Sequence, residues 1–458
     1  MIENDAFKLL LINLFHLNPD DIANILCTTF NKMMVLVVTL TDKHQACPYC
    51  GFTAPKIKEY VTKEITHSAL TTQKCIIKYR ARRYKCSCCG KTYYEFNPFV
   101  FKSQKISILT VHNILKDLKD FNETFTSVAR RYHVSPTSVS TIFDKHVDIG
   151  RNPLPEIINF DEVYAFKSEK SKYVCVLLDF KKQIPVDVLP NRKKEYLLNY
   201  FQKIPLEERK KVKYACSDMY EVYRDVVHKV FPSCCMLLDY FHLSQDFHRK
   251  MNEVRIKVMK GYKDNKASDE YYLLKKFNWL LFKNPEDEDK YGRLFDVERE
   301  RKYNSHFKSY MNYYDLRRKL LEINNDLTIC YSLKLELVDF YSKSTIDNAK
   351  VNLENLIRNC IDTNIEEMIA FSNNLINWKQ EIINSFTIVG TEYKVEADKG
   401  QMVVCNKKVN NAIIENRNKI IKCIKNNANG YTNWSRFRNR VMYVLDPNAT
   451  FSLEPREK

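Results

Sequence analysis

An acidic residue closes the short apolar run Ile157-Ile-Asn-Phe-Asp161. Two further apolar runs follow at Tyr173–Asp179 and Ile184–Leu189, and only the short connection Phe180–Gln183 separates them. Runs of this length that are rich in Val, Ile and Leu are typical of strands, and short links favour antiparallel pairing. We therefore predict three successive antiparallel strands, the first of which ends in an acid.

Helices and strands alternate after the third strand. The pattern predicts, in order, a helix at Lys194–Gln202, a strand at Val212–Asp218, a helix at Tyr220–Val230, a strand at Cys234–Asp239 and a helix from Phe241. This succession is that of the ribonuclease H-like fold, an α/β architecture with a mixed five-stranded sheet in which the first and fourth strands are neighbours. Asp161 and Asp218 would then lie side by side at the ends of those strands.

Adjacent carboxylates repel each other and are tolerated where divalent cations neutralise them. Mg²⁺ prefers oxygen ligands, and two such ions about 4 Å apart can activate an attacking oxygen and stabilise a leaving oxygen at phosphorus. We assign the third carboxylate that such a site needs to Glu415, in a predicted helix at 408–425. Helical spacing gives this helix an apolar face of Val409, Ile413, Ile420 and Ile424 and a polar face of Asn411, Glu415, Asn418 and Lys422.

Four cysteines form two C-x-x-C-G turns, with Cys47 and Cys50 in the first and Cys86 and Cys89 in the second. Two such turns make a tetrahedral structural zinc site, and the intervening residues have the pattern of strands that a zinc ribbon accommodates. The alternative is that the four cysteines bind no metal and have this spacing by coincidence. Cys88, which lies inside the second turn, is an ambiguous candidate ligand.

Basic residues surround the second cysteine pair. Residues 74–105 hold nine Lys or Arg and one acid, and Arg82 and Arg83 are the candidates for DNA contact, with a solvated face as the alternative. Residues 394–440 hold eleven Lys or Arg and three acids, so Lys419 and Lys422 are candidates for positioning DNA beside Glu415.

Residues 108–147 have the pattern of short helices, and the last two are joined at Tyr132-His-Val-Ser135. Ser135 is expected to cap the final helix, with Pro136 at its first position. The pattern predicts a helix-turn-helix, although a plain helical hairpin is the alternative. The candidate DNA-binding residues here are Arg130, Arg131, Thr137, Ser138 and Thr141.

The composition excludes several classes of protein. The 458 residues carry a net charge of +17, which favours a polyanionic partner such as nucleic acid, and the eight glycines are too far apart for a phosphate-binding loop. The 15 cysteines without a secretory signal indicate a reducing compartment, and no apolar run is long enough to span a membrane. A tyrosine recombinase is disfavoured because no His is followed by Arg in the H-x-x-R spacing.

Several segments occur in an order that is more specific than any one motif. They are Ile158-Asn-Phe-Asp161-Glu-Val, Val188-Leu-Pro-Asn-Arg192, Cys216-Ser-Asp218-Met-Tyr, Leu238-Asp-Tyr-Phe-His242, Asn411-Ala-Ile-Ile-Glu415-Asn-Arg-Asn418-Lys and Phe437-Arg-Asn-Arg440. Over residues 40–446 the chain resembles the DDE transposases of bacterial insertion sequences. It is most similar to the ISL-three family, which has an N-terminal zinc finger and a helix-turn-helix. Asn159 and Phe160 depart from the family, where smaller residues precede the first acid.

The resemblance implies a function and its residues. Asp161, Asp218 and Glu415 would hold two Mg²⁺ or Mn²⁺ ions, and Asp239 and His242 match a D-x-F-H stretch that would support the site from the next strand. The protein would bind terminal inverted repeats, hydrolyse a phosphodiester at each end and join the ends to target DNA. We expect a homodimer or larger synaptic complex in the bacterial cytoplasm, associated with the nucleoid. The alternatives are a domesticated transposase that acts as a zinc-dependent DNA-binding regulator, and a ribonuclease H-like nuclease.

The gap between Asp218 and Glu415 is too long for one strand and a link, which indicates an all-helical insertion in the catalytic domain. Trp279 is the residue of this insertion that we would test as a DNA-end contact. The expected division is an N-terminal helical segment (1–40), a zinc-binding domain (41–105), a helix-turn-helix domain (106–150), the first part of the catalytic domain (151–242), the insertion (243–396), the last catalytic helix and C-terminal part (397–446) and a loose tail (447–458).

Overall fold

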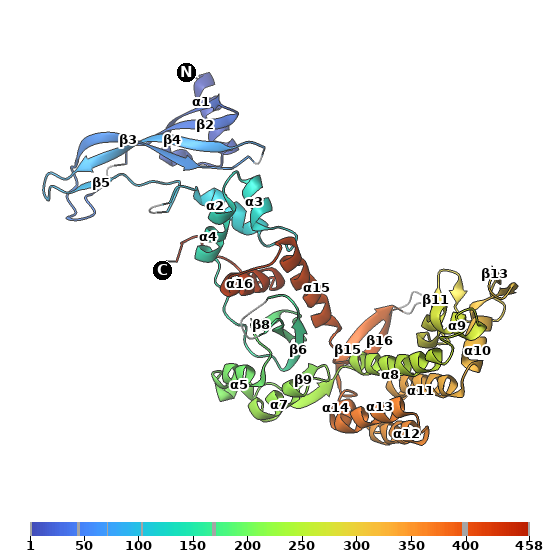
Figure 1. Cartoon of the computed structure of the whole chain (residues 1–458). Helices are drawn as coiled ribbons and strands as arrows, with labels where there is room; N and C mark the ends of the chain where they lie inside the picture. Colours follow the sequence, from blue (N-terminus) through green and yellow to red (C-terminus); the bar gives the residue numbers. More distant parts are fainter. Residues whose placement is uncertain are drawn as a thin grey trace.

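The computed structural model of the chain describes residues 2–43, 46–70, 72–101, 104–166, 171–395 and 402–456. Figure 1 shows an extended arrangement, with an N-terminal sheet at one end, a mostly helical segment at the other and a second sheet between them. The boundary expected between residues 396 and 397 and the basic residues Lys102 and Lys399 lie outside the described residues. None of the described helices is long and apolar enough to cross a lipid bilayer.

One five-stranded sheet spans residues 22–94. Helix α1 (Ile2–Leu14) precedes the strands β1 (Ile22–Phe30), β2 (Met33–Leu40), β3 (Lys56–Thr66), β4 (Cys75–Lys85) and β5 (Thr92–Tyr94). The order is β1-β2-β4-β3, and β5 pairs with β4. The prediction of a helical segment over 1–40 is therefore wrong from Ile22 onward, since only α1 and a 3₁₀ turn at Pro19–Asp21 are helical. The β-branched residues of β2 suit a strand, and Leu36 and Val38 are buried in the core of this sheet.

Three helices connect this sheet to the rest of the chain: α2 (Ile108–Asp117), α3 (Phe125–Arg131) and α4 (Pro136–His146). As predicted, Pro136 is the first residue of α4, and the Ser135 hydroxyl accepts the Ser138 N–H at 3.0 Å. Val128 and Val139 pack in a core that these helices share with Tyr443 near the C-terminus.

The second sheet consists of β6 (Ile157–Val163), β7 (Val174–Asp179), β8 (Pro185–Leu189), β9 (Tyr214–Ser217) and β10 (Cys235–Leu238), in the order β10-β9-β6-β7-β8. β6, β7 and β8 pair antiparallel, whereas β9 is parallel to both β6 and β10. The helices α5 (Lys194–Gln202), α6 (Leu206–Arg209) and α7 (Glu221–Val230) lie between its later strands. The mixed five-stranded sheet and the adjacency of the first and fourth strands are thus confirmed.

The long segment between β10 and the C-terminal helices is mostly helical. Its helices are α8 (Tyr240–Lys260), α9 (Asp269–Lys276), α10 (Tyr313–Glu322), α11 (Asn325–Lys343), α12 (Ala349–Asp362), α13 (Glu366–Asn377) and α14 (Lys379–Asn384), with a 3₁₀ helix at Asn278–Phe282. The prediction of an all-helical insertion is wrong in detail. Two short hairpins interrupt it, β11–β12 (Glu288–Asp289, Gly292–Arg293) and β13–β14 (Lys302–Asn304, Ser309–Met311). The strand β15 (Ile388–Val395) lies at its end and pairs with β16 (Met402–Lys408), which follows it. The hairpin strands are only two or three residues long, too short for a strand period to show in the sequence.

The chain then returns to the second sheet through α15 (Ala412–Asn427) and α16 (Trp434–Leu445). Ile414, Ile421 and Phe437 share a core with Val174 and Val176 of β7. The residues of α15 that are buried are Ile414, Asn418, Ile421 and Ile424. Ile413 and Ile420 of the predicted apolar face are partly buried and pack against this core. The predicted polar face is wrong at Asn411 and Asn418, which are buried, because hydrophobic periodicity alone assigns polar residues to the surface.

The C-terminal residues pack against α4. The Ser452 N–H donates to the His146 carbonyl oxygen and the Arg456 N–H to the Lys145 carbonyl oxygen, both at 3.0 Å. The expectation of a loose tail is wrong for the described part of 447–458, since these backbone groups are held by a helix end.

Candidate active site and metal-binding cysteines

Three aspartates lie at one edge of the second sheet. Asp161 is in β6, Asp218 follows β9 and Asp239 follows β10. The parallel registers pair Asn159 of β6 with Cys216 of β9, and Ser217 of β9 with Leu238 of β10. Continuing each register by one or two residues brings the three carboxylates to neighbouring positions at the carboxyl ends of three parallel-running strands.

Burial disfavours ionisation of the first two acids. Asp161 is 8% exposed; its Oδ1 accepts the Glu162 N–H at 2.7 Å and its Oδ2 accepts the side-chain amide of Asn418 at 2.8 Å. Burial, with a smaller contribution from the charge of Asp218, raises the pKa of Asp161 to about 7. Burial also raises the pKa of Asp218 to about 6, and the negative charge of Glu162 makes the second-largest contribution to this increase. Such carboxylates favour a bound cation, because a cation restores the charged form.

Glu415 reaches the same edge of the sheet from the first turn of α15. Its Oε1 lies 3.9 Å from His242 Nε2, and the same nitrogen lies 3.9 Å from Asp239 Oδ2. In the described part of the chain, Asp239, His242 and Glu415 form a group whose donor atoms all lie within 4.8 Å of one another, and neither Asp161 nor Asp218 belongs to it. Asp239 and His242, which the sequence suggested only as supporting residues, thus lie in one group with Glu415, the third predicted acid.

Asparagines fix the start of α15 above the sheet. The Asn159 side-chain amide in β6 donates to the carbonyl oxygen of Asn410 at 2.8 Å and to Oδ1 of Asn411 at 2.7 Å. The Asn411 backbone N–H donates to Asp239 Oδ1 at 3.4 Å. Asn159, which departs from the resembled family, is therefore the link that holds the helix of Glu415. The sequence feature that could have identified this residue is an asparagine within an otherwise apolar strand.

Arg192 is a site residue to which the sequence assigned no role. Its guanidinium lies between the rings of Tyr173 and Tyr220, 4.7 Å from each centroid, and forms an ion pair with Glu162. The charge of Arg192 is one of the influences that lower the pKa of Asp218. The two rings and Glu162 thus hold the Arg192 guanidinium in one orientation, next to the sheet edge that carries the three aspartates.

A cavity of about 270 Å³ opens beside two of the site residues. Asp218 and His242 line it together with Met219, Gln245, Asp246 and Arg249. Arg249 forms an ion pair with Asp246, and its side chain is two-thirds exposed. The cavity therefore opens onto Asp218 and His242.

The four predicted zinc ligands come together at the far end of the N-terminal sheet. The Sγ atoms of Cys47 and Cys89 are 3.7 Å apart, and those of Cys50 and Cys86 are 3.5 Å apart. All four lie within 4.8 Å of one another and could hold a metal ion. Cys88 is exposed and outside this group, which removes the ambiguity about the second turn.

Glycine allows both cysteine turns to close. Gly51 and Gly90 have φ of +75° and +70°, a region that side chains disfavour. Each glycine N–H donates to the carbonyl oxygen of the first cysteine of its turn, Cys47 at 2.9 Å and Cys86 at 3.0 Å. The N–H of Cys89 is the largest influence on the Cys86 thiol and helps to lower its pKa to about 7, which favours the thiolate that binds metal.

Some of the predicted DNA-binding residues form ion pairs within the protein, and others are exposed at its surface. Arg82 is bound to Glu95 at 2.8 Å with only 14% of its side chain exposed, and Arg83 is bound to Glu59 at 2.6 Å. Arg131 is bound to Asp117 and Glu123. The exposed members are Arg130, Thr137, Thr141, Lys419 and Lys422, and Ser138 is half-buried.

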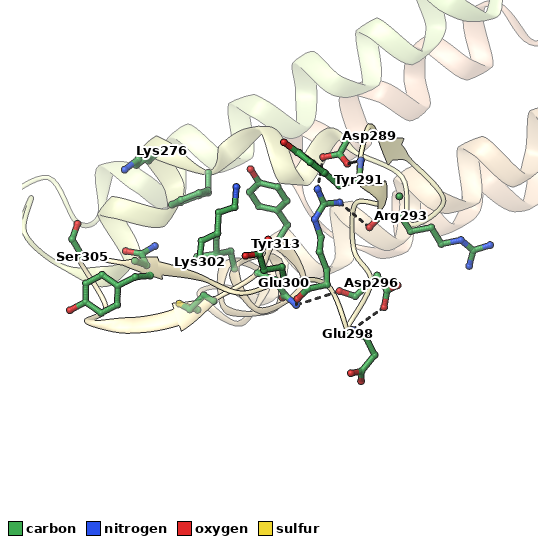
Figure 2. A pocket seen from close by; sticks show the side chains of 18 of the residues that line it. Lys276, Asp289, Tyr291, Arg293, Asp296, Glu298, Glu300, Lys302, Ser305 and Tyr313 are labelled. Atoms are coloured by element: carbon green, nitrogen blue, oxygen red, sulfur yellow. Dashed lines mark hydrogen bonds and ion pairs between the residues drawn. The ribbon is translucent and has the colours of Figure 1, made fainter.

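A separate cavity of about 540 Å³ lies in the helical segment, beside the two hairpins (Figure 2). Four cations and four carboxylates line it: Lys276, Arg293, Arg299, Lys302, Asp289, Asp296, Glu298 and Glu300. These charges balance, and Arg299 is bound to Asp289 at 2.5 Å, so the cavity has no net attraction for a polyanion. Trp279 packs edge-on against Tyr313, with ring centroids 5.1 Å apart, at the border of the helical core.

Comparison with known proteins identifies relatives of the chain. Residues 158–397, just over half of the chain, match the family model of the ISL3-type DDE transposases. The chain is also similar to the transposase for insertion sequence element IS1001 of Bordetella parapertussis. The two are 19% identical over 411 residues, which cover 89% of this chain and 91% of the relative.

Proposed function

This chain belongs to the ISL3 family of DDE transposases, and from that membership we propose that it cuts the two ends of its own insertion sequence and joins them to target DNA. Transposases bind DNA, cleave it and transfer strands. The finer proposal is that the protein recognises terminal inverted repeats and uses Asp161, Asp218 and Glu415 as its catalytic carboxylates.

The adjacency of Asp161 and Asp218 carries this proposal. A buried Asp161 and a part-buried Asp218, both with raised pKa values, are costly for the fold at the ends of parallel strands, and a phosphodiester-cleaving site gives them a use. The strand order and the return of α15 onto the sheet support a ribonuclease H-like catalytic domain formed by residues 151–242 and 397–446 around the inserted helical segment.

The donors present suit divalent cations. Asp161, Asp218 and Glu415 would hold two Mg²⁺ or Mn²⁺ ions, which supply charge neutralisation and nucleophile activation at phosphorus when bound. Asn418 orients the Asp161 carboxylate through its hydrogen bond, and Asn159 and Asn411 hold α15 in place. Arg192, clamped between two tyrosine rings, would contact the scissile phosphate.

The N-terminal part would recognise the ends of the element. We propose that α3 and α4 form a helix-turn-helix whose exposed Thr137 and Thr141 face the major groove, with Arg130 on a phosphate. The four cysteines would hold a structural zinc ion that fixes the cysteine turns at the end of the sheet. Lys419 and Lys422 are exposed on α15 and would bind the backbone of DNA close to Glu415.

Two ends must be cut together, so we propose that a homodimer or larger synaptic complex acts on the DNA, in the bacterial cytoplasm at the nucleoid. The test uses duplexes that contain the genomic DNA flanking the coding region, incubated with the full chain and Mg²⁺. Nicking at matching inverted repeats supports the proposal. Specific binding without nicking would support a domesticated regulator instead, and nicking of branched junctions or RNA–DNA hybrids alone would support a ribonuclease H-like nuclease.

A further inference from the structure

Three side chains from two helices converge at the edge of the second sheet. Asp239 precedes α8, His242 lies one turn further in α8, and Glu415 lies in the first turn of α15. His242 Nε2 is 3.9 Å from both Asp239 Oδ2 and Glu415 Oε1. This separation is too long for a hydrogen bond, but it is short enough for the donors to reach a common ion with metal–ligand distances of about 2 Å.

Two of the three converging atoms are buried without a hydrogen-bond partner. Asp239 is 3% exposed, and its Oδ2 makes no hydrogen bond with any described residue; His242 Nε2 is likewise buried and without a hydrogen bond. Buried polar atoms are normally satisfied, so a group of them facing one another indicates a ligand. The other oxygen of Asp239, Oδ1, accepts the Asn411 N–H, which leaves Oδ2 directed at the imidazole.

No lysine or arginine of the described residues compensates the acids of this group. Among the described residues, neither Asp239 nor Glu415 forms an ion pair with a lysine or arginine. Other acids near the site do have cationic partners, such as Glu162 with Arg192 and Asp246 with Arg249. His242 is the only basic side chain of the described residues within 4.0 Å of these two carboxylates, so a bound cation would compensate charge that no lysine or arginine does.

We propose that Asp239, His242 and Glu415 bind one divalent ion of the first transition row, such as Mn²⁺, in preference to Mg²⁺. The two carboxylates suit Mn²⁺ as they suit Mg²⁺, and the imidazole nitrogen favours an ion of the transition row over Mg²⁺, which prefers oxygen donors. Glu415 is shared with the proposed catalytic centre, so the role of this ion in DNA cleavage rests on the proposed function. Its binding does not, because the donors are present in the protein alone.

The test measures metal binding directly. The full chain, with zinc retained at its cysteines, is titrated with Mn²⁺, and bound Mn²⁺ is counted by continuous-wave electron paramagnetic resonance. Pulsed measurement of electron spin echo modulation then detects ¹⁴N coupling from a coordinating imidazole. We expect ¹⁴N coupling in the parent protein, its loss in His242→Gln, and at least tenfold weaker binding of that ion in both His242→Gln and Glu415→Gln.

Matched variants separate this site from the rest of the molecule. His228→Gln, which changes an exposed histidine of α7, should keep the coupling, and Asp161→Asn should keep it while losing DNA cleavage. Thermal unfolding of each variant shows that it is folded. Absence of ¹⁴N coupling in the parent, or its persistence in folded His242→Gln, would overturn the inference and leave the proposed function standing. Coupling in a protein that never cuts DNA would support this inference and refute the proposed function.

Discussion

The side-chain amide of Asn418 donates a 2.8 Å hydrogen bond to Oδ2 of Asp161, across 257 residues of sequence. Both residues are buried, one in α15 and the other in β6. This bond connects the two parts of the proposed catalytic domain that the helical segment separates. It also explains why α15 buries an asparagine in an otherwise apolar stripe.

Asn418→Ala should lower the rate of DNA-end cleavage by about 10- to 100-fold, the usual effect of removing a group that orients a metal ligand. Binding of the ends should be unchanged, because Asn418 is buried. The matched control is Asn426→Ala, at an exposed position of the same helix. Equal cleavage by the two variants would show that the hydrogen bond has no part in orienting Asp161.

The contribution of Asp161 to the stability of the metal-free protein should fall as the pH rises from about 4 to about 7. Burial raises the pKa of Asp161 to about 7 in the folded chain, whereas the unfolded chain releases this proton near the ordinary value of about 4. The unfolded state then binds fewer protons over this range, so the free energy of unfolding falls as the pH rises.

Asp161 alone contributes at most about 4 kcal/mol to this decline. Denaturant unfolding at a series of pH values should therefore show a flatter profile for Asp161→Asn than for the parent protein. Adding Mn²⁺ to the parent should flatten the profile as well, because the bound ion favours the ionised carboxylate. An identical pH profile for parent and variant would contradict this account of Asp161.

Removing the metal from the cysteine site should destabilise the N-terminal sheet. Cys47→Ser should release zinc, lower the melting temperature and weaken binding of the element ends, since a structural zinc site contributes directly to folding. Cys88→Ser is the control, because Cys88 is exposed and outside the four-cysteine group. Zinc content per chain is the readout, and zinc loss from Cys88→Ser instead would show that the ligand set is different.

Two neighbouring arginines should have different effects. Arg130 is exposed on α3, so Arg130→Ala should weaken DNA binding and reduce the salt dependence by about one phosphate contact. Arg131 is bound to Asp117 and Glu123, so Arg131→Ala should lower stability while changing the salt dependence little. Binding measured across a salt series, with melting temperatures, distinguishes them; the reverse pattern would exclude the proposed orientation of α3.

The regular elements of the second sheet were predictable from the sequence. The run Ile157-Ile-Asn-Phe-Asp161 is a strand because its apolar residues are buried, and the helix at Lys194–Gln202 has the predicted bounds. The four-cysteine group was predictable because the spacing within each turn determines its local geometry. In these cases a short stretch of chain contains the whole signal.

Other features depend on partners far away in the sequence. The pairing of β2 with β4 makes residues 33–40 a strand, and no local pattern identifies that partner. Arg82 is occupied by Glu95 from the loop after β5, which a count of charges does not reveal. The contact of His242 with Glu415 joins residues 173 positions apart, so it appears only once α15 is placed on the sheet.

The most direct test of the account is the cleavage of a labelled duplex that spans one end of the element, in Mg²⁺ or Mn²⁺, with end binding measured in parallel. The parent protein and the control Glu207→Ala, which changes an exposed acid of α6, should nick at the end and leave a 3′-hydroxyl. Asp161→Ala, Asp218→Ala and Glu415→Ala should each bind the end and fail to nick it. Cleavage by any of these three folded variants at the parent rate would contradict the assignment of that carboxylate to the catalytic centre.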